Sequence, residues 1–303
     1  MTSGPDPDGA TWRELRRRSA EAIGNPIESR WLLEEASGLD GPALLREIDQ
    51  IAPPEATERL ESLLRRRLAG EPLQHVLGHW SFRHLEVAVD SRVLVPRPET
   101  EHVVSIALRE PDRLRRSLEG SERPTGRRGA EMLAVDLRTG SGVIAFSLVT
   151  ERDAVRVIAT DRDRDALNVA SDNLRGLRAD VAARVELRLG DWFEVLPEEA
   201  SGRIHLIVAN PPYLAEHEWP GLAPTVRDFD PFGALVAGPS GLEAIEAILA
   251  AAPTWLSQHG SVVVEIAPQQ ASAATDLARA AGFGTVSVED DLVGRPRVLV
   301  ARR

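Results

Sequence analysis

The spacing of apolar residues divides this chain into a helical first part and a longer part in which strands and helices alternate. Over the first 80 residues, leucines recur three and four positions apart, as at Leu60, Leu63 and Leu64. This spacing predicts amphipathic helices, which glycines and prolines separate from one another. We therefore expect residues 1–80 to form a small helical domain.

A short segment with a different period follows these helices. Apolar residues alternate with polar ones from Phe82 to Val89, and the apolar pattern resumes at Val93 after a polar turn signal. Alternation with period two is typical of strands. The pattern predicts a β-hairpin linker over residues 81–95, which leaves residues 96–303 for a second domain.

From Met132 onward, apolar runs typical of strands alternate with helical patterns. The predicted strands cover residues 132–137, 155–160, 185–189, 206–209, 262–266, 286–288 and 298–301. Alternating strands and helices predict an α/β fold with a mostly parallel sheet covered on both faces, and the last two runs predict a closing hairpin. Residues 109–130 are rich in Arg, Glu, Ser, Gly and Pro, so we expect a mobile surface connection there.

Composition indicates a globular protein and excludes several kinds of site. Of the 303 residues, 43% are hydrophobic and 27% are charged, and no apolar run is long enough for a membrane span. The polar N-terminus lacks a signal-peptide pattern, and the absence of Cys excludes disulfides and Cys-ligated zinc. His75 and His79 lie four residues apart, but Gly78 interrupts a helical presentation, so no metal site is expected. The net charge of −11 argues against a direct nucleic-acid footprint. The lack of Cys fits a cytoplasmic protein, no membrane contact is expected, and a monomer is the default expectation.

The residues Asn210-Pro211-Pro212-Tyr213 carry the strongest functional signal in the chain. They follow the apolar run 206–209, so a buried strand delivers Asn210 to its carboxyl end, where open α/β sheets bind ligands. The prolines have a fixed φ and cannot donate to a sheet ladder, which makes the segment stiff. An amide and the Pro211 carbonyl held there can accept hydrogen bonds from an NH2 group. The pattern predicts chemistry on a planar, weakly nucleophilic nitrogen, although Asn-Pro also occurs at ordinary strand exits.

A loop from Asp136 to Gly142 joins the first strand of this domain to its helix. Gly140 and Gly142 permit a tight turn, and the helix start offers free N–H groups to a carboxylate or a phosphate. With Ala145 these glycines also satisfy a dinucleotide fingerprint, and Asp161 lies where a ribose-binding acid would sit. Taken alone, the loop leaves an NAD-dependent oxidoreductase open.

The acids at the ends of consecutive strands favour a different ligand. Asp136 ends the first strand, where it can face an ammonium group, and Asp161 ends the second, where it can hold ribose hydroxyls. Asp191 ends the third strand beside Trp192 and Phe193, which suits an adenine amine and ring. Ammonium, ribose and adenine without a phosphate describe S-adenosylmethionine. The ordered set of acids therefore favours this cofactor over a dinucleotide.

With these motifs the chain resembles the HemK/PrmC-type release factor glutamine methyltransferases over nearly its whole length. The Pro-Arg-Pro-Glu-Thr-Glu stretch at residues 96–101 and the helical N-terminal domain are specific to that family. Asn-Pro-Pro-Tyr is shared with adenine-N6 DNA methyltransferases. Further stretches of resemblance are residues 70–78, 92–95, 136–142, 191–193, 226–231 and 291–297. The resemblance implies the fold of a class I S-adenosylmethionine-dependent methyltransferase, Rossmann-like with a seven-stranded sheet.

The resemblance also implies an activity and residue roles. The family transfers a methyl group from S-adenosylmethionine to the side-chain amide nitrogen (N5) of the Gln in the Gly-Gly-Gln loop of class I peptide chain release factors, which the N-terminal domain helps to hold. Asn210 and the Pro211 carbonyl would accept hydrogen bonds from the Gln NH2 group, and Tyr213 would pack against the amide plane. The implied catalytic and substrate-binding residues are Asn210, Pro211, Pro212 and Tyr213. The implied cofactor-binding residues are Thr100, Asp136, Arg138, Thr139, Gly140, Gly142, Asp161, Asp191, Trp192, Phe193 and Asn210.

Arg138 departs from the pattern of the family, which usually has glycine at this position. An arginine there could clash with the methionine part of the cofactor, could require a positive φ, or could reach the methionine carboxylate. Asp230 and Ser240 likewise replace a more usual Glu and Asp. Two alternatives stay open. Arg138 leaves open a non-catalytic paralogue with an impaired cofactor site, and the shared Asn-Pro-Pro-Tyr motif leaves open an adenine-N6 DNA methyltransferase.

Overall fold

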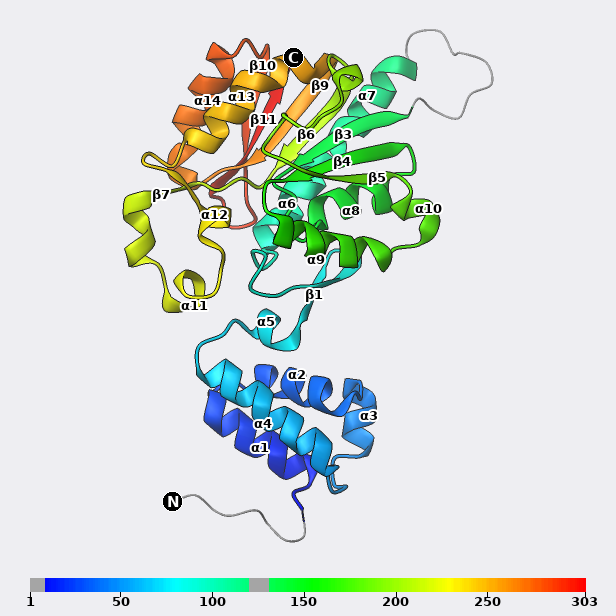
Figure 1. The fold of residues 1–303 in the computed structure, drawn as a ribbon, viewed down its shortest axis with the longest axis vertical. Coiled ribbons are helices and arrows are strands. Elements are labelled where there is room, and N and C mark those ends of the chain that lie inside the picture. Colours follow the sequence, from blue (N-terminus) through cyan, green and yellow to red (C-terminus); the bar gives the residue numbers. More distant parts are fainter. Residues whose placement is uncertain (1–8, 120–130) are drawn as a thin grey trace. The chain divides into compact units, whose positions relative to one another are not determined.

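The computed structural model describes residues 9–119 and 131–303, and its backbone falls into two compact units. The helical unit comprises Met1–His79 together with Pro224–Phe229. The sheet unit comprises Trp80–Ala223 and Asp230–Arg303. Figure 1 traces the chain through both units. None of the helices in the described residues is long and apolar enough to cross a bilayer.

Amphipathic helices surround one apolar core in the helical unit. They are α1 (Trp12–Ile23), α2 (Pro26–Ser37), α3 (Gly41–Arg46), α4 (Pro54–Leu68) and α5 (Leu73–Leu77). The unit also contains the short α11 (Pro224–Arg227), none of whose residues is buried. Leu60 and Leu63 of α4 are buried against Leu32 and Leu33 of α2, which confirms the helical prediction. Thr11 starts α1 with a capping box, which satisfies backbone N–H groups that have no partner inside the helix.

The hairpin after these helices lies earlier than predicted. Strands β1 (His79–Phe82) and β2 (Leu85–Ala88) pair with each other, and their turn falls at residues 83–84. The strand expected at residues 93–95 is wrong, because this segment is irregular. Val93 belongs to the main apolar core, so burial without sheet pairing explains the apolar pattern there.

Part of the expected surface connection is helical. Helix α7 (Arg109–Glu119) buries Leu114 in the apolar core. Glu110 is only 2% exposed, and its carboxylate accepts hydrogen bonds from Arg302 at 2.7 and 3.0 Å. The expectation of a mobile connection is therefore wrong for α7. The rest of the expected connection, residues 120–130, lies outside the described residues.

One sheet with the order β10-β11-β9-β6-β3-β4-β5 forms the centre of the sheet unit (Figure 1). Its strands are β3 (Met132–Leu137), β4 (Val155–Asp161), β5 (Val185–Leu189), β6 (Ile204–Ala209), β9 (Leu256–Glu265), β10 (Thr285–Asp290) and β11 (Pro296–Arg302). The pairs among β5, β4, β3, β6 and β9 are parallel, whereas β11 is antiparallel to both of its neighbours. The predicted seven-stranded, mostly parallel sheet with a C-terminal hairpin is confirmed.

Helices cover both faces of this sheet (Figure 1). They are α6 (Pro98–Ala107), α8 (Val143–Glu151), α9 (Arg164–Arg175), α13 (Glu243–Trp255) and α14 (Ala271–Ala280). The unit also contains the short helices α10 (Ala179–Ala182) and α12 (Phe232–Leu235) and the paired short strands β7 (Leu214–Ala215) and β8 (Val236–Gly238). Successive strand residues point to opposite faces. Ala134 thus packs in the core that contains α6, α8 and α9, and Val135 packs in the core that contains α13 and α14.

The order of the strands creates a crevice beside β3. The chain leaves β3 for β4 and β5 on one side and then returns to β6 on the other side. In open parallel sheets, ligands bind at such a reversal, outside the carboxyl ends of the strands. The loops after β3, β4 and β6 meet at this edge.

Asn173 on α9 ties strand β2 to the loop after β3. Its Nδ2 donates to the carbonyl oxygens of Ala88 at 3.1 Å and Ser141 at 2.9 Å, and its Oδ1 accepts from the Ala88 N–H at 2.7 Å. Asn173→Ala should lower the free energy of unfolding by about 1–3 kcal/mol, because three backbone groups lose their partner. Urea unfolding measures this change. Asn168→Ala, on the exposed face of the same helix, should change stability by less than about 0.5 kcal/mol, and equal effects would contradict the assignment.

Candidate active site

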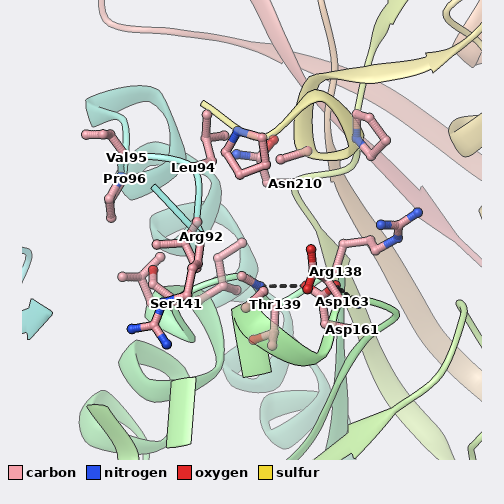
Figure 2. Close-up of a pocket in the computed structure, with 18 of the residues that line it drawn as sticks. Arg92, Leu94, Val95, Pro96, Arg138, Thr139, Ser141, Asp161, Asp163 and Asn210 are labelled. Carbon is pink, nitrogen blue, oxygen red and sulfur yellow. Dashed lines mark hydrogen bonds between the residues drawn. The ribbon is translucent and has the colours of Figure 1, made fainter. Parts of the chain in front are cut away.

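A cavity opens in the sheet unit at the carboxyl ends of β3, β4 and β6 (Figure 2). Its wall comes from the loops after these strands and from the irregular segment that precedes α6. The space inside it, open mouth included, is about 880 Å³. Among the described residues, no group of His, Cys, Asp and Glu is arranged to hold a metal ion.

Asp136 supports the loop after β3 from below and does not belong to the cavity wall. Its side chain is fully buried, and its Oδ2 accepts hydrogen bonds from Thr139 Oγ1 at 2.6 Å and from the Ala145 N–H at 3.1 Å. Within the described part of the chain, its buried Oδ1 has no hydrogen-bond partner. Burial raises the pKa of Asp136 to about 7. Asp136, which was predicted to face the ammonium group of a cofactor, therefore lies beneath the loop and holds it in place.

Asp161 both fixes the same loop and forms part of the cavity wall. Its Oδ2 accepts from the Gly140 N–H at 2.9 Å, and its Oδ1 accepts from the Asp163 N–H at 3.0 Å (Figure 2). Burial raises the pKa of the Asp161 carboxyl group. Thr139 and Gly140 line the cavity beside it, so the structure brings together the residues predicted to face the ribose and the methionine part of a cofactor.

Arg138 has a backbone φ of 62°, in the left-handed region that favours glycine. Of the three possibilities that the sequence left open for this residue, the structure shows the positive φ. Its side chain extends away from Thr139 in Figure 2. The guanidinium lies 4.8 Å from the centre of the Trp192 ring, and Nε lies 3.4 Å from Asp191 Oδ1. Burial lowers the pKa of Arg138, and the carboxylates of Asp161 and Asp191 oppose part of this shift.

The predicted adenine side of the site is organised differently from the expectation. Arg138 lines the cavity, whereas its partners Asp191 and Trp192 do not belong to the lining. Phe193 is 6% exposed and stacks on Trp255, with 6.1 Å between the ring centres. Arg138 therefore stands between the cavity and the residues predicted to face adenine.

Asn210 reaches the cavity from the end of β6, together with Pro212. Its Nδ2 donates to Thr100 Oγ1 on α6 at 3.0 Å. Pro211 is buried and Tyr213 is half-buried, and the lining includes neither of them. The structure thus brings Asn210, Pro212 and Thr100 together in the wall of the cavity.

Gln270 holds the Asn-Pro-Pro-Tyr segment, and sequence reasoning missed this residue. Its Nε2 donates to the carbonyl oxygens of Tyr213 at 2.9 Å and Gly241 at 2.8 Å, and its Oε1 accepts from the Ala267 N–H at 3.0 Å. A buried amide with these partners fixes the backbone that carries Asn210. Local sequence contains no signal for this role, because a Gln after a strand is typical of an ordinary helix start.

The segment before α6 contributes cavity residues to which the sequence analysis gave no individual role. Arg92, Leu94 and Pro96 line the cavity (Figure 2). Arg97 lines it as well, and its Nη2 donates to the buried Asp230 carboxylate at 2.7 Å. The Pro-Arg-Pro-Glu-Thr-Glu stretch was the available signal, since two prolines at alternate positions exclude a regular strand.

Comparisons with known proteins place these features in one family. The profile of the PrmC N-terminal domain matches residues 12–78, and that of the methyltransferase small domain matches residues 127–222. A release factor glutamine methyltransferase of Cereibacter sphaeroides is 39% identical over 91% of this chain and 90% of its own length. Another of that name, from Moorella thermoacetica, is 37% identical over 95% of each chain.

One solved structure is similar to this chain in fold, at low sequence identity. The hMettl16 catalytic domain, in complex with the MAT2A 3′UTR hairpin 6, aligns with a TM-score of 0.52. The alignment covers 82% of this chain and 80% of that chain, at 13% identity. The similarity supports the methyltransferase fold of the sheet unit.

Gly142 and Gly140 allow a matched test of the loop. Both have a positive φ, of 89° and 56°, but only at Gly142 would an added Cβ meet another group, the buried Phe146 ring at 2.1 Å. Gly140→Ala should cost about 1–2 kcal/mol of stability through its backbone alone. Gly142→Ala should cost about 1–3 kcal/mol more, because Phe146 must also move. Equal unfolding midpoints of the two variants in urea would contradict this account.

The buried carboxyl group of Asp136 predicts a dependence of stability on pH. Its pKa is about 7 in the folded state against 3.8 when unfolded, so the folded state retains a proton that the unfolded state loses. Stability should therefore fall as pH rises between about 4 and about 7, and Asp136→Asn should reduce this slope. Urea unfolding across that range measures it. Asp153→Asn, at an exposed carboxyl group, should keep the wild-type slope; a loss there too would refute the assignment to Asp136.

Proposed function

The chain belongs to the family of release factor glutamine methyltransferases, and from this membership we propose its reaction. It transfers a methyl group from S-adenosylmethionine to N5 of the glutamine in the Gly-Gly-Gln loop of a class I peptide chain release factor. The observation that carries the proposal is that Asn210 and Pro212 of the Asn-Pro-Pro-Tyr segment and the glycine loop after β3 line one cavity at the switch point of the sheet. The names of the relatives support the choice of substrate.

The residues of the cavity fit S-adenosylmethionine, which supplies an electrophilic methyl group on a sulfonium. An added Cβ at Gly140 would meet no atom within 4 Å, so this loop leaves open space at the wall. Thr139 and Gly140 would face the methionine part, and Asp161 would accept hydrogen bonds from the ribose hydroxyls. Asp191 and Trp192 would face adenine only where Arg138 releases its contacts with them. Arg138 therefore competes with adenine at this end of the site.

Positioning is the main contribution of the protein in this proposal. An amide nitrogen is a poor nucleophile, because its lone pair is delocalised. The Asn210 side-chain oxygen and the Pro211 carbonyl would accept hydrogen bonds from the substrate NH2 group and orient it for in-line attack. Such orientation can contribute roughly 7–11 kcal/mol, and the two dipoles also stabilise positive charge that develops on the nitrogen. The proton then leaves to water.

The helical unit supplies a candidate docking domain. The PrmC N-terminal profile covers residues 12–78, nearly all of its described helices. We propose that residues 1–80 hold the release factor, while residues 96–303 bind the cofactor and carry the reaction. Residues 81–95, expected as a separate linker, belong to the sheet unit. A cytoplasmic monomer fits this role.

Mass spectrometry tests the proposed reaction. The purified chain is incubated with a class I release factor and S-adenosylmethionine, and the Gly-Gly-Gln peptide should gain the mass of one methyl group. A release factor with alanine in place of that glutamine should gain none. Two further experiments address the alternatives: calorimetric titration with S-adenosylmethionine, and a methylation assay on an adenine-containing DNA duplex. Absence of cofactor binding would establish a non-catalytic paralogue, and methylation of the DNA would establish an adenine methyltransferase.

Asn210→Ala should lower turnover by about 10²–10³, because one preorganised polar group at the reacting nitrogen is lost. The dissociation constant of the cofactor should stay near that of the wild type, since the glycine loop and Asp161 are untouched. Steady-state kinetics and calorimetry measure the two quantities. Wild-type turnover in this variant, with Asn168→Ala as the matched surface control, would rule out the role of Asn210.

A further inference from the structure

A line of three hydrogen-bonded side chains leads from the buried interior of the sheet unit to the cavity. Glu265, at the end of β9, accepts from Thr100 Oγ1 at 2.8 Å, and Thr100 Oγ1 accepts from Asn210 Nδ2 at 3.0 Å. Glu265 and Thr100 are each 2% exposed. Thr100 and Asn210 line the cavity, whereas Glu265 lies behind them. The line joins three elements that are 165 and 110 residues apart in sequence.

The ionised form of Glu265 dictates the direction of both hydrogen bonds. A carboxylate can only accept, so the Thr100 hydroxyl must donate its single proton to Glu265. The oxygen of Thr100 can then only accept, and Asn210 must offer its NH2 group to it. The Asn210 side-chain oxygen is then turned away from Thr100. This oxygen is the acceptor that the NH2 group of a substrate needs.

We propose that Thr100 and Glu265 are positioning residues that set which end of the Asn210 amide faces the substrate. This inference rests on the proposed function and adds two residues to it. Neither residue touches the reacting atoms in this scheme. They act through Asn210, whose two amide ends are alike in size and differ only in hydrogen bonding.

The same line has a second, reversed arrangement. A protonated Glu265 donates to Thr100, the Thr100 hydroxyl then donates to the Asn210 oxygen, and the amide turns its NH2 group to the cavity. Two NH2 groups would then face each other, which removes one acceptor from the substrate. The reversal needs one proton at Glu265 and a rotation of Asn210, without any movement of the backbone.

The surroundings of Glu265 allow both arrangements near neutral pH. Burial raises its pKa to about 7, and Glu99 of α6 raises it further. Thr100, Arg297 of β11 and Arg97 before α6 oppose this rise. Burial raises the pKa of Tyr213, which follows β6, and Glu265 raises it further. Within residues 9–119 and 131–303, the one side-chain hydrogen bond of Glu265 is that from Thr100, so a change in its protonation reaches the Asn210 amide through this bond.

Nuclear magnetic resonance tests the relay without reference to turnover. The side-chain NH2 signals of Asn210 are identified by their loss in Asn210→Ala and followed between about pH 5.5 and 8.5. In the wild type they should shift with a midpoint near that of Glu265. The shift should disappear in Glu265→Gln and in Thr100→Val. A wild-type signal that does not titrate, or one that still titrates in Glu265→Gln, would overturn the proposal whether or not the protein methylates a release factor.

Kinetics then test the consequence for the reaction. Thr100→Val keeps the shape of the side chain but removes the hydroxyl, and it should lower kcat by about 10²-fold. Thr100→Ser keeps the hydroxyl and should stay close to the wild type. The wild-type kcat should fall below about pH 7, and Glu265→Gln, which has no proton to gain, should lose this fall.

A double variant separates the relay from general damage to the fold. If Glu265 acts through Thr100, Thr100→Val/Glu265→Gln should be no slower than Thr100→Val alone. Independent, additive losses, or a wild-type kcat in Thr100→Val, would overturn the inference. Absence of methylation by the wild type would count against the proposed function alone, because the resonance titration still decides the relay. Thermal unfolding of each variant identifies any change that comes from a misfolded protein.

Discussion

The parallel pairing of β3 with β4 on one side and with β6 on the other is the constraint on which the site depends. Leu137, the last residue of β3, lies opposite Thr160 of β4 and Ala209 of β6. The residues that follow these strand positions, Arg138 and Asn210 among them, therefore emerge at one edge. A slip of one residue in either ladder would turn the side chains of that strand to the opposite face. The hydrophobic cores on both faces oppose such a slip, so packing far from the cavity sets its geometry.

Buried carboxyl groups support the site from behind. Asp136, Asp161 and Glu265 all lie at carboxyl ends of strands, and burial raises the pKa of each. The unfavourable burial is offset by hydrogen bonds from the residues that form the cavity, among them Thr139 and Thr100. These acids thus contribute order to the loops at the expense of stability near neutral pH. That balance is typical of a site whose geometry matters more than its contribution to folding.

Arg138 shows how a local departure from a pattern is accommodated. Its backbone takes the left-handed conformation that glycine adopts easily, and its side chain leaves the loop for Trp192 and Asp191. The loop itself keeps its hydrogen bonds to Asp136 and Asp161. The substitution therefore changes the far end of the cavity, toward the residues expected to face adenine. Neither of these two Arg138 contacts involves Asn210 or Thr100, which line the cavity together.

The sequence by itself determined the alternation of strands and helices, the glycine turn and the stiff exit at Asn210, because periodicity, Gly and Pro act through chain neighbours. It also placed acids at strand ends, which was enough to predict the edge of the sheet that holds the site. Only the tertiary structure decided that Asp136 lies beneath the loop, that Gln270 holds Tyr213 and that Glu265 reaches Asn210 through Thr100. It likewise decided that residues 109–119 form a helix, which buries Leu114 and Glu110. These features depend on partners distant in sequence, as many as 192 residues away for Glu110, and no local pattern specifies a hydrogen bond across that separation.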